Sequence, residues 1–161
     1  MSLDGFVRRF CLRHSMVLLA LCVLGSGCSK RTGDCRRLIG KVNDALRAID
    51  SRPPVNTDDI PAVTKDRADL ARRYDKLSRE VAELRLSDPE LVPRAKRYAE
   101  LARAASDVLN RGVQALQKRD PDAVEESRAE FDAVTKKEAL LVKEINGFCL
   151  PEAVPSSSAS R

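Results

Sequence analysis

From residue 34 onward, apolar residues recur every three or four positions, in four stretches that proline-containing segments separate. This spacing places the apolar residues on one face of an α-helix. The first stretch follows Asp34, which we expect to be a helix N-cap, and it ends near Ser51, because Pro53-Pro54 comes next. Its apolar positions are Cys35, Leu38, Ile39, Val42, Ala45, Leu46 and Ile49.

Each of the three later stretches opens with an acidic residue and a proline close behind it, which together form a helix start signal. The signals are the segments Asp58–Pro61, Ser87–Glu90 and Asp120–Pro121, and Pro151 ends the last stretch. The row of residues on the apolar face of each helix is called its seam. The seam of the second stretch is Val63, Leu70, Tyr74, Leu77, Val81 and Leu84, and that of the third is Leu91, Ala95, Tyr98, Ala102, Ala105, Leu109, Gly112 and Leu116. The seam of the fourth is Val124, Phe131, Val134, Leu141, Ile145 and Phe148. No stretch alternates with period two, so the pattern predicts an all-α protein.

Very short turns separate the second, third and fourth predicted helices, which forces neighbouring helices to run antiparallel. The pattern therefore predicts an up-down bundle of four helices over residues 34–150. The first helix would measure about 27 Å and the third about 46 Å. Residues 52–57 must then climb about 20 Å to the start of the second helix, which an extended chain can do. We expect three long helices packed side by side, which we call the pillar, and one short first helix. The extended segment 52–57 that follows the short helix is called the strap.

The first 27 residues have the pattern of a secretory signal peptide. Basic residues, among them Arg8 and Arg9, precede the nine-residue apolar run Met16–Leu24, which is too short for a membrane span of about 20 residues. Gly25, Ser26 and Gly27 follow, and Cys28 comes next. The alternative for this run is a short buried helix of the fold.

The small residues before Cys28 resemble the lipobox of bacterial lipoproteins, although Leu24 stands four positions before the cysteine instead of three. The resemblance implies that Cys28 is lipidated and becomes the mature N-terminus, with residues 28–33 as a linker to the bundle. It also implies an outer-membrane anchor facing the periplasm, because Ser29 stands where an Asp favours retention in the inner membrane.

Removal of the signal would also remove Cys11 and Cys22, which leaves Cys35 and Cys149 beside the lipidated Cys28. Exported proteins fold in an oxidising compartment where disulfides persist, so we predict that these two cysteines pair. The bridge would close nearly the whole folded segment. The alternative is a reactive thiol, but the chain has no C-x-x-C spacing.

Charge and composition argue against several classes of function. Without residues 1–27, the excess of basic over acidic residues falls from five to three, and we expect no nucleic-acid partner. The single histidine, His14, lies in the signal, so a mature chain would lack imidazole ligands and His-based catalysis. Glu-x-x-His pairs and Gly-rich phosphate loops are missing as well. We therefore expect no enzyme, no metal and no cofactor.

Two charged residues interrupt the apolar seams. Arg67 in the second helix is expected at the level of Asp107 in the third, where it would form a register-fixing pair or line a small anion site. The alternative is an arginine that reaches the surface beside apolar neighbours. Glu138 in the fourth helix is either an acid with a raised pKa and a function, or a residue at the edge of the seam.

The sequence thus predicts a membrane-anchored helical lipoprotein that acts as a non-catalytic adaptor or structural module of the cell envelope. Its partners would be the bilayer, through the lipid, and another envelope protein at the end of the bundle far from Cys28. The alternative is a periplasmic binding or sensor protein for a small anionic ligand or an envelope polymer, which would use Arg67 or the flank under the strap. Residues 151–161 are predicted to form a disordered tail.

Overall fold

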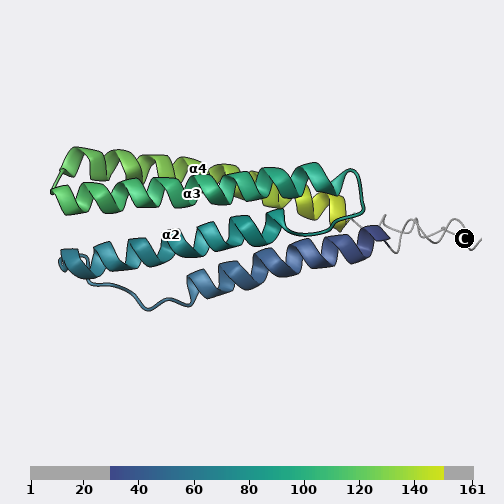
Figure 1. Cartoon of the computed structure of the whole chain (residues 1–161), viewed down its shortest axis with the longest axis horizontal. Coiled ribbons are helices and arrows are strands. Elements are labelled where there is room, and N and C mark those ends of the chain that lie inside the picture. The colour runs from purple at the N-terminus through teal and green to yellow at the C-terminus, as the bar shows by residue number, and fades with distance from the viewer. Residues whose placement is uncertain (1–29, 151–161) are drawn as a thin grey trace, which may run out of the picture.

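The computed structural model describes residues 30–150, which form an antiparallel bundle (Figure 1). The expected signal peptide, Cys28 and the tail 151–161 lie outside the described residues. An N-terminal helix covers residues 30–50, and α2 (Ile60–Ala82), α3 (Leu91–Lys118) and α4 (Pro121–Cys149) follow. No strand occurs within residues 30–150. The predicted all-α, up-down architecture of four helices is confirmed.

The local start signals work as expected. Asp59 caps α2 by accepting a hydrogen bond from the backbone N–H of Ala62 at 3.0 Å, and Asp120 caps α4 in the same way through Ala123 at 3.1 Å. Arg119 closes α3 in the left-handed region with φ 56°, so the turn between α3 and α4 needs only two residues.

The α3 helix is the central element. It packs against both α2 and α4, and it buries twelve of its 28 residues, whereas α4 buries only three of its 29. Small side chains make this possible, since Ala95, Ala99, Ala102 and Ala105 let neighbouring helices approach closely. The N-terminal helix adds Leu38, Val42 and Ile49 to the same core, and the other helices complete it.

The N-terminal helix begins earlier than predicted. Residues 30–33, which the sequence assigned to a linker, are helical, and Asp34 lies inside the helix instead of capping it. The helix ends at residue 50, so it covers only part of the length of the bundle, and residues 51–59 run as a non-helical strap to the start of α2 (Figure 1). The predicted pillar with a short helix and a strap is therefore confirmed.

The predicted disulfide is also confirmed. Cys35 and Cys149 are joined, with their Cα atoms 5.6 Å apart and 114 residues between them in sequence. The bond ties the N-terminal helix to the end of α4. We call this end of the bundle, formed by residues 30–37, 83–90 and 147–150, the proximal end, and the opposite end, formed by residues 58–65 and 115–124, the distal end. None of the helices within residues 30–150 combines the length and hydropathy of a membrane span.

Candidate functional site

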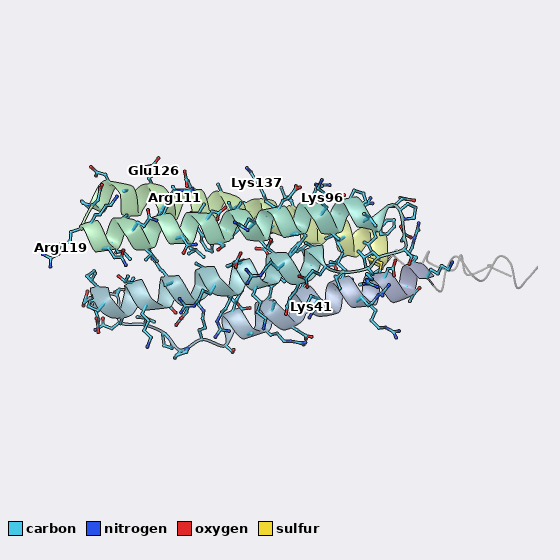
Figure 2. All side chains as sticks on the ribbon, viewed as in Figure 1. Lys41, Lys96, Arg111, Arg119, Glu126 and Lys137 are labelled. Atoms are coloured by element: carbon cyan, nitrogen blue, oxygen red, sulfur yellow. A yellow bond between two sulfur atoms is a disulfide. The ribbon has the colours of Figure 1, made fainter. Side chains whose placement is uncertain are left out.

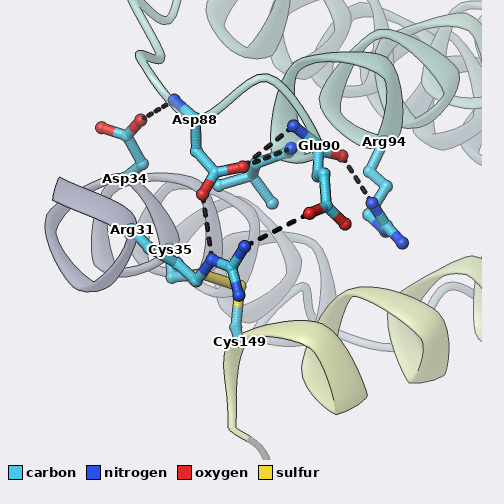
Figure 3. The surroundings of a disulfide bond; sticks show 8 residues. Arg31, Asp34, Cys35, Asp88, Glu90, Arg94 and Cys149 are labelled. Carbon is cyan, nitrogen blue, oxygen red and sulfur yellow. Dashed lines mark hydrogen bonds and ion pairs between the residues drawn. A yellow bond between two sulfur atoms is a disulfide. The ribbon is translucent and has the colours of Figure 1, made fainter. Parts of the chain in front are cut away.

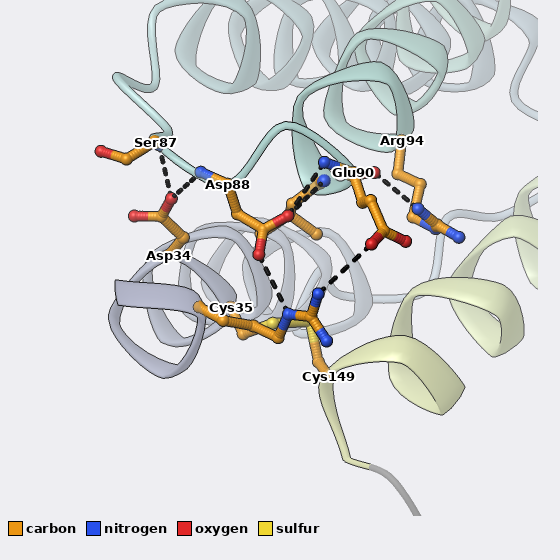
Figure 4. A network of polar contacts seen from close by, with 9 residues as sticks. Asp34, Cys35, Ser87, Asp88, Glu90, Arg94 and Cys149 are labelled. Carbon is orange, nitrogen blue, oxygen red and sulfur yellow. Dashed lines mark hydrogen bonds and ion pairs between the residues drawn. A yellow bond between two sulfur atoms is a disulfide. The ribbon is translucent and has the colours of Figure 1, made fainter. Parts of the chain in front are cut away.

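Asp34 joins two distant segments at the proximal end (Figure 4). Its carboxylate is 2% exposed and accepts hydrogen bonds from the backbone N–H groups of Ser87, at 2.5 Å, and Asp88, at 2.8 Å. Arg37 donates to the other oxygen. Burial alone would raise the pKa of Asp34, but the bonds from Arg37 and the two backbone groups outweigh burial and lower it.

Asp88 organises the loop before α3 in a similar way (Figure 3). One oxygen accepts from the backbone N–H groups of Glu90 and Leu91, at 2.9 and 3.1 Å, which caps the start of α3. The other accepts from Arg31 Nε at 3.0 Å. The Arg31 bond is the main reason that the pKa of Asp88 is lowered, against an opposing effect of burial.

The disulfide lies within this network. Two guanidinium groups, from Arg31 and Arg94, lie 4.3 and 4.4 Å from the centre of the Phe148 ring, next to Cys149. Arg94 also donates to the carbonyl oxygen of Glu90. The N-terminal helix, the loop 83–90 and the end of α4 are therefore fastened to one another at the proximal end by covalent, ionic and cation–π contacts.

Glu138 belongs to a second polar group, in the middle of the core. The hydroxyl of Tyr98, a fully buried residue, donates to Glu138, which is itself half-buried. Burial raises the pKa of Glu138, and the bond from Tyr98 opposes this rise. Burial and the nearby Glu138 carboxylate also raise the pKa of Tyr74 to about 12, and its ring meets Phe131 edge-on at 5.9 Å. The tyrosines are packing residues, since Tyr74 is only 5% exposed.

The register-fixing pair of Arg67 with Asp107, one of the interpretations of Arg67, does not form. Asp107 has a side chain that is 54% exposed and pairs with Arg103 at 3.5 Å. Arg67 Nη1 instead lies 3.1 Å from the position that a Cβ atom on Gly112 would take, and Ser127 of α4 contacts the same position. The half-buried guanidinium therefore enters the space between α2, α3 and α4, and no carboxylate among residues 30–150 pairs with it.

The register differs because the connection between α2 and α3 is longer than the sequence indicated. The α2 helix ends at Ala82 and α3 begins at Leu91, so eight residues are non-helical. A short turn at Ser87 between two continuous helices would place Arg67 opposite residue 107. This connection also runs along the bundle, so α3 starts beyond the end of α2 (Figure 1), and Arg67 lies beside Gly112 instead of Asp107.

The flank under the strap has no excess positive charge. It is a hollow of about 440 Å³ between the strap and α2, and its charged lining residues are Asp50, Arg52, Asp66 and Arg67. Arg52 pairs with Asp66 at 2.7 Å and donates to the carbonyl oxygen of Ile49. Two acids and two bases line the hollow, so this flank offers an anion little net attraction.

The distal end carries an apolar groove that the sequence reasoning missed. It has a volume of about 980 Å³ and lies between the start of α2 and the turn joining α3 to α4. Its apolar lining includes Ile60, Pro61, Ala68, Val113, Leu116 and Val124. Ile60 is 48% exposed, and Lys65 is one of the two basic lining residues. The other is Arg119, which projects from the distal end of the bundle (Figure 2). The available signal was the short first helix, which stops before this end and leaves it with three helices.

The described side chains show no assembled metal centre: within residues 30–150, no group of three or more His, Cys, Asp or Glu side chains is placed to hold a metal ion. Glu138 and Tyr98 form a buried acid–phenol pair. The distal groove, at about 980 Å³, is larger than the hollows of about 640 and 650 Å³ along the sides of the bundle. No protein-family model, curated protein or solved structure matches this chain.

Proposed function

We propose that the protein is an exported lipoprotein, anchored through Cys28, whose bundle is a non-catalytic adaptor for another envelope protein. The observation that carries the proposal is that the apolar groove lies at the end of the bundle opposite to the one that Cys28 would anchor. Cys28 precedes the disulfide cysteine Cys35 by only seven residues, whereas the apolar groove lies at the far end of the bundle. A helix with the length of α3 spans about 42 Å. The anchor would thus hold the groove away from the membrane, where a partner can reach it.

The chemistry of the groove favours a protein partner. An exposed apolar groove between helices is a common site for an amphipathic segment of another protein. The N-terminal helix ends at residue 50, so only three helices and the strap reach the distal end. In addition, Val124, Phe131 and Val134 of α4 remain only half-buried along this part of the bundle. A segment bound here would cover apolar surface that the chain leaves open.

Site-specific photo-crosslinking in intact cells tests the adaptor function. A photoreactive amino acid replaces Gln117, an exposed groove residue, and in the matched control it replaces Gln114, which is exposed on the same helix but does not line the groove. We expect a recurrent envelope-protein adduct from position 117, none from position 114, and loss of the adduct in an Ile60→Glu background. Equal labelling at both positions, or no adduct at position 117, would contradict the proposal.

A second candidate function, binding of a small anionic ligand, is favoured by one observation. Arg67 is a half-buried cation without a carboxylate partner among residues 30–150, so an anion could supply the missing charge. Thermal unfolding with phosphate, sulfate and small carboxylates tests this function. A shift that disappears in Arg67→Ala would favour the ligand-binding alternative, whereas the absence of any shift would exclude it for these anions.

A further inference from the structure

The start of the N-terminal helix limits how far the bundle can stand from its anchor. Lys30 is already helical and lies two residues after Cys28. Two extended residues reach at most about 7 Å. The polar region of each bilayer leaflet is about 5–8 Å thick. A lipid on Cys28 would therefore bring the proximal end into contact with the headgroups, because the chain between them is too short to act as a flexible spacer.

Exposed charge at the proximal end is mostly positive. Residues 30–37 include four exposed basic residues, namely Lys30, Arg31, Arg36 and Arg37. The single acid of this segment, Asp34, is 2% exposed and turned towards Ser87 and Asp88 (Figure 4). Arg37 pairs with Asp34 and Arg31 pairs with Asp88, whereas Lys30 and Arg36 have no acid partner within residues 30–150. Bases therefore outnumber acids on the exposed surface of this segment.

The loop 83–90 adds one exposed cation to the proximal end, beside two exposed acids. Arg85 is exposed, whereas Asp88 is 9% exposed and bonded to Arg31 and to the start of α3. Two acids of the loop remain exposed, Glu83 and Glu90, and Glu90 pairs with Arg31 at 3.4 Å. At the same end Leu150 is 68% exposed, which adds an apolar side chain suited to a membrane interface.

The long faces of the bundle carry both paired basic residues and ones unpaired within residues 30–150, such as Lys136 and Lys137. Many of their basic residues pair with acids one helical turn away, as in Arg72 with Asp69 and Arg79 with Asp75. Lys30, Arg36 and Arg85 form no ion pair with residues 30–150. Cations without an acid partner, placed next to the proposed anchor, are available to bind anionic headgroups, which attract basic residues close to the membrane surface.

We propose that the proximal end is a binding surface for anionic phospholipid headgroups and that it holds the bundle upright on the membrane. This inference rests on the lipid anchor of the proposed function. One lipid signal combined with a basic patch is a recognised route to firm membrane attachment. Contacts from both the N-terminal helix and the loop 83–90 would resist tilting about the single anchor point. The distal groove would then face away from the bilayer.

The experiment uses the lipidated, disulfide-bonded protein in vesicles of phosphatidylcholine, with or without 30% phosphatidylglycerol. A donor dye is attached to a Gln114→Cys variant, and the vesicles carry acceptor dyes on their headgroups. In an upright bundle residue 114 lies about 35 Å along α3 from its start. We expect lower energy transfer in the anionic vesicles than in the neutral ones, and loss of this difference in high salt.

Charge variants decide whether the proximal cations are responsible. Lys30→Gln, Arg36→Gln and Arg85→Gln are combined, since none of these residues has an ion pair to lose within residues 30–150. The matched control combines Lys118→Gln, Lys136→Gln and Lys137→Gln, which removes the same charge from exposed positions elsewhere. We expect the proximal triple variant to abolish the lipid-dependent difference and the control to preserve it.

The outcomes separate this inference from the proposed function. A mass spectrum that shows an unlipidated N-terminus would overturn both. A lipidated protein whose energy transfer is equal in the two vesicle types, or unchanged by the proximal triple variant, would overturn the headgroup surface alone and leave the adaptor function standing.

Discussion

At Gly112 side chains of both α2 and α4 contact the backbone of α3, and the replacement of Gly112 tests the packing at the entry to the distal half. Residue 112 lies on α3, and both Ser127 of α4 and Arg67 of α2 contact the space next to its Cα atom. A Cβ atom there would lie 2.7 Å from Ser127 Oγ and 3.1 Å from Arg67 Nη1. Gly112→Ala therefore adds one methyl group where there is no room for it.

The expected cost follows from these neighbours. Arg67 can move, because its contact is the end of a flexible side chain, but Ser127 is 6% exposed and its hydroxyl donates to the carbonyl oxygen of Val124 at 2.9 Å. Losing that bond costs about 1 kcal/mol, and overpacking costs about 1–3 kcal/mol. Alanine regains about 1 kcal/mol through its helix propensity. We expect Gly112→Ala to lower the free energy of unfolding by about 2 kcal/mol.

Urea unfolding followed by circular dichroism measures this change in a double-mutant cycle with Ser127→Ala. Without the Ser127 hydroxyl, the nearest α4 atom is the Cβ of residue 127 at 3.5 Å, an ordinary contact, so Gly112→Ala should then be neutral or stabilising by up to about 1 kcal/mol. Gly40→Ala is the matched control, because nothing lies within 4 Å of its added Cβ, and it should stabilise. An equal cost of Gly112→Ala in both backgrounds would refute the reasoning.

Three further substitutions test the other polar and covalent contacts. Asp34→Asn should lower the free energy of unfolding by about 1–3 kcal/mol at pH 7. Because the pKa of Asp34 is lowered in the folded state, this difference from wild type should shrink as the pH of the urea titration falls below the ordinary value of 3.8. A difference that is constant with pH would contradict this prediction. Glu138→Gln should raise Tm at pH 7 and have little effect at pH 4, because a raised folded pKa costs stability only once the unfolded carboxyl has ionised; equal shifts at both pH values would count against this assignment. The double variant Cys35→Ser, Cys149→Ser should lose up to about 4–5 kcal/mol in urea unfolding, and an unchanged midpoint would show that the bridge does not stabilise the fold.

Helix starts were predictable because their chemistry is local. The N-caps Asp59 and Asp120 accept bonds from N–H groups only three residues away, so the residues that signal each helix also build its first turn. Asp34 has the same local signature, but its partners Ser87 and Asp88 lie more than fifty residues further along the chain. The Asp34 carboxylate thus binds backbone groups of the loop 83–90 instead of capping its own helix, and residues 30–33 before it are helical. No pattern within a short window can show this.

The register of α2 against α3 was unpredictable for a related reason. Leu84 and Leu86 continue the apolar character of α2, and both are half-buried, but they lie in the non-helical connection after Ala82. Hydrophobic spacing records which residues enter the core, and an irregular segment can bury apolar residues as well as a helix can. The end of α2 was therefore placed too late, and Arg67 was assigned to the level of Asp107. The distal groove was missed as well, because it depends on how three helix ends sit in space.

The two ends of the bundle differ in how firmly they are fastened. The proximal end combines the disulfide, the buried carboxylates of Asp34 and Asp88, and two guanidinium groups on Phe148. The distal end has an open groove, and α4 buries only Ser127 in its distal half. Local stability follows the density of buried contacts, and binding surfaces often occupy the less stable part of a fold. A firmly fastened end beside the proposed anchor and a more adaptable end away from it are consistent with the proposed adaptor, which would stand on a membrane and receive a partner at its far side.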